Sequence, residues 1–203
     1  MTETKSNMDP VYILSLSLKL FVTCVVVSGL LGAVNMVTLP NITRIKAEQK
    51  NAAMQAVVTD ENSTFEDVEV SEEAASAASA AGAKLTGASA VLLNGENAGY
   101  ALTVVASGSQ GTIEMMVGVD AEGTVTGVSI VDNSETPGIG SKVMGNEPTA
   151  SGVGVLDQFQ GKSAADGTLA VGSNIDGITG ATVSSRGVTA GVNAALAAAA
   201  VMA

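Results

Sequence analysis

The sequence predicts an α+β fold, in which one N-terminal transmembrane helix precedes a domain with a mainly antiparallel sheet and flanking helices. Three observations support it: residues 11–39 are mostly apolar, residues 99–131 hold three β-rich runs separated by turns, and residues 184–203 are rich in Ala. The expected domains are an N-terminal segment with the transmembrane helix (1–40), a membrane-proximal helix and linker (41–83), and a terminal domain (84–203).

The apolar segment 11–39 is long enough to cross about 30 Å of hydrocarbon as a helix. Lys19 lies near its start and can extend its amine toward the interface. A cleaved signal peptide is the competing interpretation. The residues before the segment are only weakly basic, and the apolar run continues to Val37, so a retained anchor is favoured. Basic residues flank both sides, so the charge pattern does not determine the orientation.

Pro40 is expected to end this helix, because proline removes a backbone donor and disturbs the preceding turn. Residues 43–58 then predict a short, separate membrane-proximal helix. The acidic stretch 60–73 indicates a solvated linker or the frayed start of a helix. Residues 71–83 are rich in Ala and Ser and permit a helix.

Strand composition dominates the middle of the chain. Residues 99–106, 112–119 and 124–131 are β-rich, and turn residues separate them, so an antiparallel meander is predicted. Residues 169–175 predict a further short strand. The Ala-rich residues 184–203 predict a C-terminal helix.

Charge and composition exclude several functions. Residues 1–50 carry a net charge of +2, whereas residues 51–203 hold four basic and seventeen acidic side chains, a net of −13. A domain this acidic repels phosphate backbones, so no nucleic-acid partner is expected. Cys24 has no second cysteine to pair with, and the chain has no His. Neither a metal site nor a hydrolase with a His base is therefore expected, and no catalytic residue is assigned.

A short motif near the end of the chain, residues 176–182, reads Asp-Gly-Ile-Thr-Gly-Ala-Thr. Gly180 and Ala181 are small and let backbone amides approach a ligand closely. The helix that follows offers free N–H groups and a positive dipole end, which suit a phosphate. Ser184 and Ser185 are candidates to cap that helix and to donate to phosphate oxygens. An ordinary helix start after a Gly turn stays open as the alternative.

A second motif, residues 135–140, reads Glu-Thr-Pro-Gly-Ile-Gly. Its proline and two glycines forbid a regular element and indicate a shaped loop. Taken alone, Glu135 is either an exposed loop carboxylate or part of a ligand site. Thr136 and Ile139 are either loop packing or ligand contacts, and Lys142 is either a surface charge or the neutraliser of an anionic ligand.

The N-terminal span followed by these two motifs resembles the G subunit of the Rnf electron-transport complex, and is similar to the C subunit of the sodium-pumping NADH:quinone reductase. The resemblance covers roughly residues 10–200, and the length suits the Rnf protein better. It implies an FMN-binding domain in which FMN is joined by a phosphoester to the hydroxyl of Thr182. A separate, Mg-dependent flavin transferase that uses FAD would make that bond, so this chain would be its substrate and an electron carrier rather than a catalyst.

The resemblance also implies a set of cofactor-binding residues. By this resemblance, the loop 135–140 is expected to pack against the isoalloxazine ring. Asp176 is expected to belong to the transferase recognition motif, and Thr179 to lie near the phosphate. The full set comprises Thr182, Thr179, Gly180, Ala181, Ser184, Ser185, Asp176, Glu135, Thr136, Ile139 and Lys142. Relatives commonly carry a His where this chain has Asn133, which does not titrate near neutral pH, so a proton-coupling role of that side chain is not expected here.

The implied partners are the other membrane subunits of the Rnf complex and the flavin transferase. The implied location is the cell membrane, crossed once, with the flavin domain on the outer, periplasm-side face. Three alternatives stay open: a stand-alone anchored flavoprotein that passes electrons to extracellular acceptors, the C subunit of a sodium-pumping NADH:quinone reductase, and an anchored binding domain without a cofactor.

Overall fold

The computed structural model describes residues 10–58 and 63–202. The chain divides into two compact units, Met1–Ala47 and Glu48–Ala203. Residues 1–9, 59–62 and 203 lie outside the described residues. They include residues 60–62 of the acidic stretch expected as a linker and the last residue of the expected C-terminal helix.

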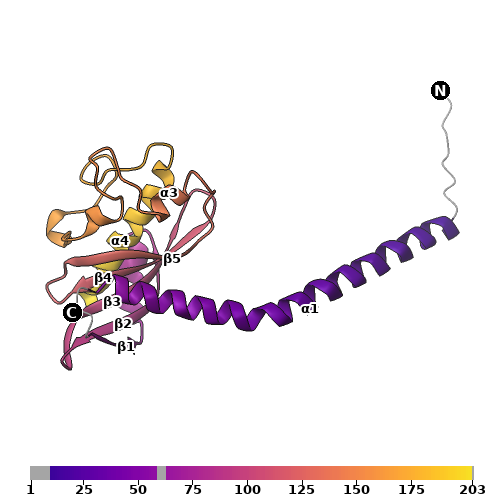
Figure 1. Ribbon diagram of the computed structural model, residues 1–203, viewed down its shortest axis with the longest axis horizontal. Helices are drawn as coiled ribbons and strands as arrows, with labels where there is room; N and C mark the ends of the chain where they lie inside the picture. The colour runs from indigo at the N-terminus through magenta and orange to yellow at the C-terminus, as the bar shows by residue number, and fades with distance from the viewer. Residues whose placement is uncertain (1–9, 59–62, 203) are drawn as a thin grey trace. The chain divides into compact units, whose positions relative to one another are not determined.

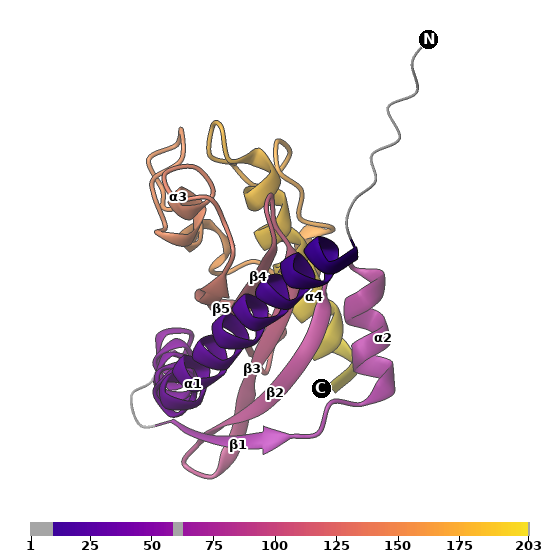
Figure 2. The same cartoon turned by 90° about the vertical axis from the view of Figure 1, so that its right-hand side faces the viewer.

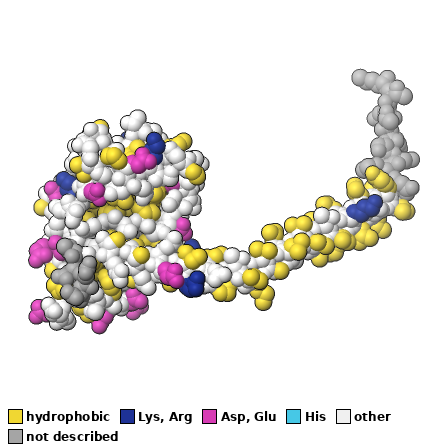
Figure 3. Space-filling view, viewed as in Figure 1, with side chains coloured by type: hydrophobic (Ala, Val, Ile, Leu, Met, Phe, Trp, Pro, Cys, Tyr) yellow, Lys and Arg dark blue, Asp and Glu magenta, His cyan; other side chains and the backbone are white. Residues whose placement is uncertain are grey.

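The first unit is formed by most of helix α1, which runs from Pro10 to Ala56. Its apolar side chains are exposed, and they follow one another along the helix in Figure 3. Its most apolar stretch has a mean hydropathy of 2.2, and none of it is buried. A helix this hydrophobic, with no protein covering it, has the composition of a membrane span. Within the described residues it is the one helix long and apolar enough to cross a bilayer.

The helix does not end at Pro40, so the prediction of a separate helix over residues 43–58 is wrong. A proline interrupts one backbone hydrogen bond, whereas ending the helix there would leave several carbonyl groups without partners. The hydroxyl of Thr43 donates to the carbonyl oxygens of Pro40 (2.9 Å) and Leu39 (3.2 Å) and gives this part of the helix additional hydrogen bonds.

The second unit is built on a five-stranded antiparallel sheet in the order β1-β2-β3-β4-β5 (Figure 1). The strands are β1 (Thr64–Val68), β2 (Lys84–Leu93), β3 (Glu96–Ser107), β4 (Thr112–Asp120) and β5 (Val125–Asn133). The predicted meander over β3, β4 and β5 is confirmed.

Two strands were not predicted. β1 lies within the acidic stretch expected as a linker or frayed helix, so that expectation is wrong for its residues. It pairs at the sheet edge with β2, where Ser89 donates a hydrogen bond to Asp67 Oδ1 (2.9 Å). Acidic, short strands are common at sheet edges, because charge there discourages pairing with other chains. β2 is rich in Ala, Gly and Ser, which carry little strand propensity, and its place in the sheet comes from pairing on both sides.

Two helices cover one face of the sheet (Figures 1 and 2). α2 (Glu72–Ala80) begins at Ser71, whose hydroxyl accepts from the Ala74 amide, and confirms the helix expected in 71–83. α4 (Thr182–Met202) confirms the C-terminal helix and starts two residues before its predicted position. The core between α4 and the sheet consists of small aliphatic and Met side chains, among them Val104, Met115, Val117, Val188, Val192 and Ala195.

The long connection from β5 to α4 contains only short helical segments: α3 (Ser141–Met144), η1 (Asp157–Phe159) and η2 (Ala164–Asp166). The strand expected over residues 169–175 is wrong: this stretch is a turn with one isolated bridge between Val171 and Ile175. Gly172 has a φ of +89°, and Asn174 Oδ1 accepts from the amide of Ala170 (2.8 Å), so a local turn replaces pairing with the sheet.

The last turn of α1 and the residue after it pack on the opposite face of the sheet. Ala53 and Val57 are buried there against Val91, Ala101 and Met116. The hydroxyl of Thr126 donates to the carbonyl oxygen of Val57. The backbone at Val57 also lies so close to Gly118 that a side chain at that position would collide with it.

Gly118→Ala is therefore expected to destabilise the second unit by about 1–3 kcal/mol, the usual cost of overpacking a tight site. The matched control is Gly87→Ala, on β2, where an added Cβ would meet Thr103 at an ordinary 3.5 Å. Urea denaturation of the detergent-solubilised chain measures both. Equal stability of the two variants would contradict the close packing at Gly118.

Candidate functional site

The candidate site lies at the end of the sheet where β3 turns into β4. The loops between β5 and α4 and the first turn of α4 gather at this end (Figures 1 and 2). Both sequence motifs, 135–140 and 176–182, fall in this part of the domain.

The motif 176–182 leads directly into α4. Gly180 has a φ of +86°, which turns the chain, and the amide of Ala181 donates to the carbonyl of Ile178 (2.9 Å). Thr182 is the first helical residue and its side chain is exposed. The first bond between successive helical turns runs from the Ser185 amide to the Ala181 carbonyl (2.9 Å). The amides of residues 182–184 precede that bond, so they have no acceptor within the helix and are directed out of its end.

Ser184 and Ser185, which follow the motif 176–182, are inside the helix, and the expectation that they cap it is wrong. Ser184 and Ser185 are each 1% exposed. The hydroxyl of Ser185 donates to the carbonyl of Ala181 (3.0 Å) and accepts from the amide of Ile178 (3.2 Å). The hydroxyl of Ser184 donates to Glu135 Oε2 (2.7 Å). Both hydroxyl hydrogens therefore have protein acceptors.

Glu135 is not an exposed loop carboxylate, since it is only 8% exposed. Its Oε1 accepts from the amides of Ser109 (2.7 Å) and Gln110 (3.4 Å), at the β3–β4 turn, while Oε2 accepts from Ser184. Its own amide donates to Asn133 Oδ1 (3.2 Å). The side chain of Asn133 thus accepts a hydrogen bond from the backbone at the start of the loop. Hydrogen bonds replace the water that burial of this carboxylate removes.

Residues 136–139 of the loop 135–140 are exposed. Thr136 is exposed, and its carbonyl accepts from the amide of Ile139 (3.2 Å) in a tight turn. Gly138 has a φ of +81°, and its amide donates to Ser141 Oγ (2.7 Å). These bonds hold the side chain of Ile139 in the open, 52% exposed. Lys142, in α3, is half-buried.

Asp176 is held through its backbone by a residue that the sequence motifs do not include. The amide of Asp176 donates to Gln158 Oε1, and Gln158 Nε2 donates to the carbonyl of Asp176, both at 2.8 Å. The carboxylate of Asp176 is left exposed. Gln158 belongs to no recognisable motif, so only the structure identifies it.

Among the described residues, the hydrogen bond between Glu135 and Ser184 joins the loop 135–140 to the helix that follows the motif 176–182. Thr136, Ile139, Lys142 and Asp176 make no hydrogen bond to residues 179–185 in this part of the chain. The buried members of the predicted set are Glu135, Ala181, Ser184 and Ser185, and Lys142 is half-buried. The exposed members are Thr136, Ile139, Asp176, Thr179, Gly180 and Thr182.

Arg186 was also missed by the sequence predictions. It is exposed and lies four residues after Thr182 on α4, so the two side chains are neighbours on one helix face. Long helical side chains point back toward the N-terminus, which directs the guanidinium of Arg186 toward Thr182. The four-residue spacing between Thr182 and Arg186 is the sequence feature from which this neighbour could have been predicted.

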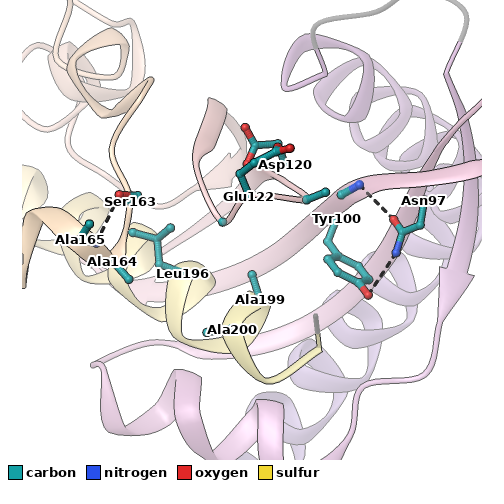
Figure 4. Close-up of a pocket in the computed structure, with 13 residues that line it drawn as sticks. Asn97, Tyr100, Asp120, Glu122, Ser163, Ala164, Ala165, Leu196, Ala199 and Ala200 are labelled. Carbon is teal, nitrogen blue, oxygen red and sulfur yellow. Dashed lines mark hydrogen bonds between the residues drawn. The ribbon is translucent and has the colours of Figure 1, made fainter.

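A separate hollow of about 440 Å³ lies toward the other end of α4 (Figure 4). Tyr100, Leu196 and Ala199 contribute to its lining, and Asp120 and Glu122 lie on the β4–β5 side. Leu196 follows Thr182 by fourteen residues, which corresponds to about 20 Å along a helix. This hollow is therefore not part of the candidate site.

Comparison with known proteins adds independent information. Residues 108–197 match the FMN-binding domain family. The chain is 35% identical over 203 residues to the G subunit of the Na(+)-translocating ferredoxin:NAD(+) oxidoreductase complex of Acetobacterium woodii, covering 95% of this chain and 94% of that protein. It is 30% identical over 190 residues to the G subunit of the ion-translocating oxidoreductase complex of Methanosarcina acetivorans, covering 88% and 92%. The solved structure of the C subunit of Na(+)-translocating NADH-quinone reductase from Parabacteroides distasonis aligns with a TM-score of 0.46 at 17% identity, covering 79% and 94%.

Gln158→Ala is expected to cost about 1–2 kcal/mol, since two hydrogen bonds to the Asp176 backbone are lost. The loop 176–181 should also exchange its amide hydrogens faster. Gln160→Ala, at an exposed position nearby, is the control and should leave both quantities unchanged. Denaturation and hydrogen exchange measure the two effects, and an unchanged loop in Gln158→Ala would refute the role of this amide.

Proposed function

The chain belongs to the family of G subunits of ion-translocating ferredoxin:NAD(+) oxidoreductase (Rnf) complexes, and from this premise we propose that it carries FMN bound covalently through a phosphoester to Thr182. In this proposal it relays electrons within a membrane-bound, ion-translocating complex. One observation carries the assignment of the attachment point: within the matched domain, Thr182 presents an exposed hydroxyl at the first residue of α4.

The residues around Thr182 fit a phosphate. The amides of residues 182–184 precede the first bond within the helix, and the helix dipole favours negative charge at that end. Ser184 and Ser185 direct their hydroxyl hydrogens to protein acceptors, so the backbone supplies most of the donors. Arg186 adds a positive charge on the same helix face, in a unit whose net charge is strongly negative.

The surroundings also fit a flat, largely apolar ring. Ile139 and Val183 are apolar side chains that are 52% and 54% exposed, so both are available to contact an apolar ring. A Cβ built on Gly180 would have no atom within 4 Å, so there is open space beside Thr182. We propose that Ile139 and Val183 contact the ring and that Lys142 and Thr136 lie at its edge.

Attachment requires a separate flavin transferase with FAD as the donor. Thr182 loses its hydroxyl proton, its Oγ bonds to the phosphorus of the FMN half of FAD, the pyrophosphate bond breaks and AMP leaves. Asp176, exposed at the start of the motif, is proposed to be read by that enzyme. Once bound, the flavin supplies the electron transfer, and this chain holds and orients it.

The exposed apolar side chains of α1 support a location in the cell membrane. We propose that α1 crosses the membrane once and that the flavin domain lies on the outer, periplasm-side face. The other membrane subunits of the complex are the proposed electron-transfer partners.

Thr182→Val should abolish covalent flavin, because a methyl group replaces the nucleophilic hydroxyl with little change in shape. Thr182→Ser keeps the hydroxyl and should retain part of the labelling. The chain is co-expressed with the transferase, and intact mass and in-gel fluorescence measure the adduct. Thr168→Val, at an exposed threonine outside both motifs, is the matched control and should still be labelled. An adduct on Thr182→Val would overturn the assignment.

Arg186→Glu should slow flavin attachment by roughly 3- to 30-fold, since a charge that attracts phosphate becomes one that repels it. Lys162→Glu makes the same charge change on the loop before η2 and serves as the control. Initial rates with purified transferase and FAD distinguish the two variants. Equal slowing in both would indicate an effect of net charge rather than of Arg186.

A further inference from the structure

We propose that Glu135 is a positioning residue that fixes the first turn of α4 through Ser184, so that Thr182 is presented in one orientation before any flavin is attached. The inference rests on the proposed function of Thr182. It assigns to Glu135 a role that differs from contact with the flavin ring.

The first step is the way the carboxylate is shared. Oε1 takes hydrogen bonds from the amides of Ser109 and Gln110, and Oε2 takes one from the hydroxyl of Ser184 (2.7 Å). One buried side chain thus joins the β3–β4 turn, the loop 135–140 and α4. Because Glu135 is buried, loss of any of these bonds would leave a buried polar group without a partner, so each bond contributes to holding the three segments together.

The second step is the packing around that carboxylate. A Cβ placed on Gly108 or on Gly140 would overlap a carboxylate oxygen of Glu135. Both positions therefore need glycine because Glu135 is there, and neither glycine has a positive φ that would demand it for another reason. Two of the loop's features, its Glu and its last Gly, are explained by contacts inside the protein.

The third step links the carboxylate to Thr182. Ser184 is two residues after Thr182 in the same helical turn, and the ends of helices open easily because their first amides lack partners. Without the bond to Glu135, Ser184 would lose its hydrogen-bonded connection to the loop 135–140 and the β3–β4 turn. The first turn would then be held mainly by bonds within the segment 178–185, such as those from Ala181 to Ile178 and from Ser185 to Ala181. Fixing this turn fixes the direction of the Thr182 hydroxyl, and a nucleophile that is held in place reacts faster than one that must be ordered first.

The test compares Ser184→Ala, Glu135→Gln and Glu135→Ala in the full chain, expressed without the transferase. Ser184→Ala removes the connection and leaves the bonds of Glu135 to the β3–β4 turn. Gln at position 135 can still accept from the Ser109 amide through its oxygen and donate to Ser184 through its NH₂ group. Glu147→Ala, an exposed carboxylate after α3, is the matched control.

Hydrogen exchange is the first readout, because it needs no flavin. The amide of Ser185 and those of the residues just after it should exchange about tenfold faster in Ser184→Ala, while those of residues 195–202 stay unchanged. Glu135→Gln and Glu147→Ala should match the wild type. Glu135→Ala should behave like Ser184→Ala, or lose stability throughout if the protein fails to fold. Unchanged exchange in Ser184→Ala would overturn the proposal.

Flavin attachment with purified transferase, Mg²⁺ and FAD is the second readout. Its initial rate should fall about tenfold in Ser184→Ala and stay within about twofold of wild type in Glu135→Gln. A rate in Glu135→Gln as low as in Glu135→Ala would show that the charge itself is needed and would overturn the positioning role. A wild-type chain that carries no flavin on the Thr182 peptide would refute the proposed function, whereas the exchange experiment would still decide on the link between Glu135 and Ser184.

Discussion

The close approach of α4 to the sheet is the constraint on which the rest of the domain depends. A Cβ added to Gly187 would collide with the carbonyl of Ser107, and one added to Gly191 would meet Met115 Sδ at 2.6 Å. The core of the domain consists mostly of Ala, Val, Leu and Ile, since the whole chain has few aromatic residues. Small side chains allow the helix axis to lie near the strands, and close packing leaves little freedom for the helix to shift along them. Gly187 rests on the last residue of β3, so the first turn of α4 is next to the β3–β4 turn. The position of the motif 176–182 is thus a consequence of packing in the core. At the end of the sheet, the hydrogen bonds of Glu135 with the β3–β4 turn and with Ser184 also hold the start of α4 in this position.

The sequence predicted those elements whose signal is local. β3, β4 and β5 carry β-branched residues between clear turns, and α4 carries a long Ala-rich run. β2 was missed because its Ala, Gly and Ser residues become a strand only by pairing with neighbours. The prediction of a helix break at Pro40 was wrong for the opposite reason. The local signal was clear, but the hydrogen bonds of the helix on both sides of Pro40 outweighed the loss of one hydrogen bond.

The candidate site shows the same limit. Glu135 was assigned an exposed or ligand-facing role because its partners, Ser109 and Ser184, are 26 and 49 residues away in the chain. No spacing rule connects them, and only the packing of α4 on the sheet brings them together. Thr182 is exposed at the first residue of α4, and the Ala-rich composition after it does predict a helix in this region.

At the start of α4, the helical period rather than the residue type decides which side chains of residues 182–186 are buried. Thr182, Val183 and Arg186 are exposed, whereas Ser184 and Ser185 between them are buried. The four polar residues of this stretch therefore have two distinct roles. The buried hydroxyls bond to Glu135 and to the preceding backbone, and they cannot also be the main donors to a ligand outside the helix. The exposed hydroxyl and guanidinium are one helical turn apart, so they are the polar groups that a ligand at this end of the domain would meet together.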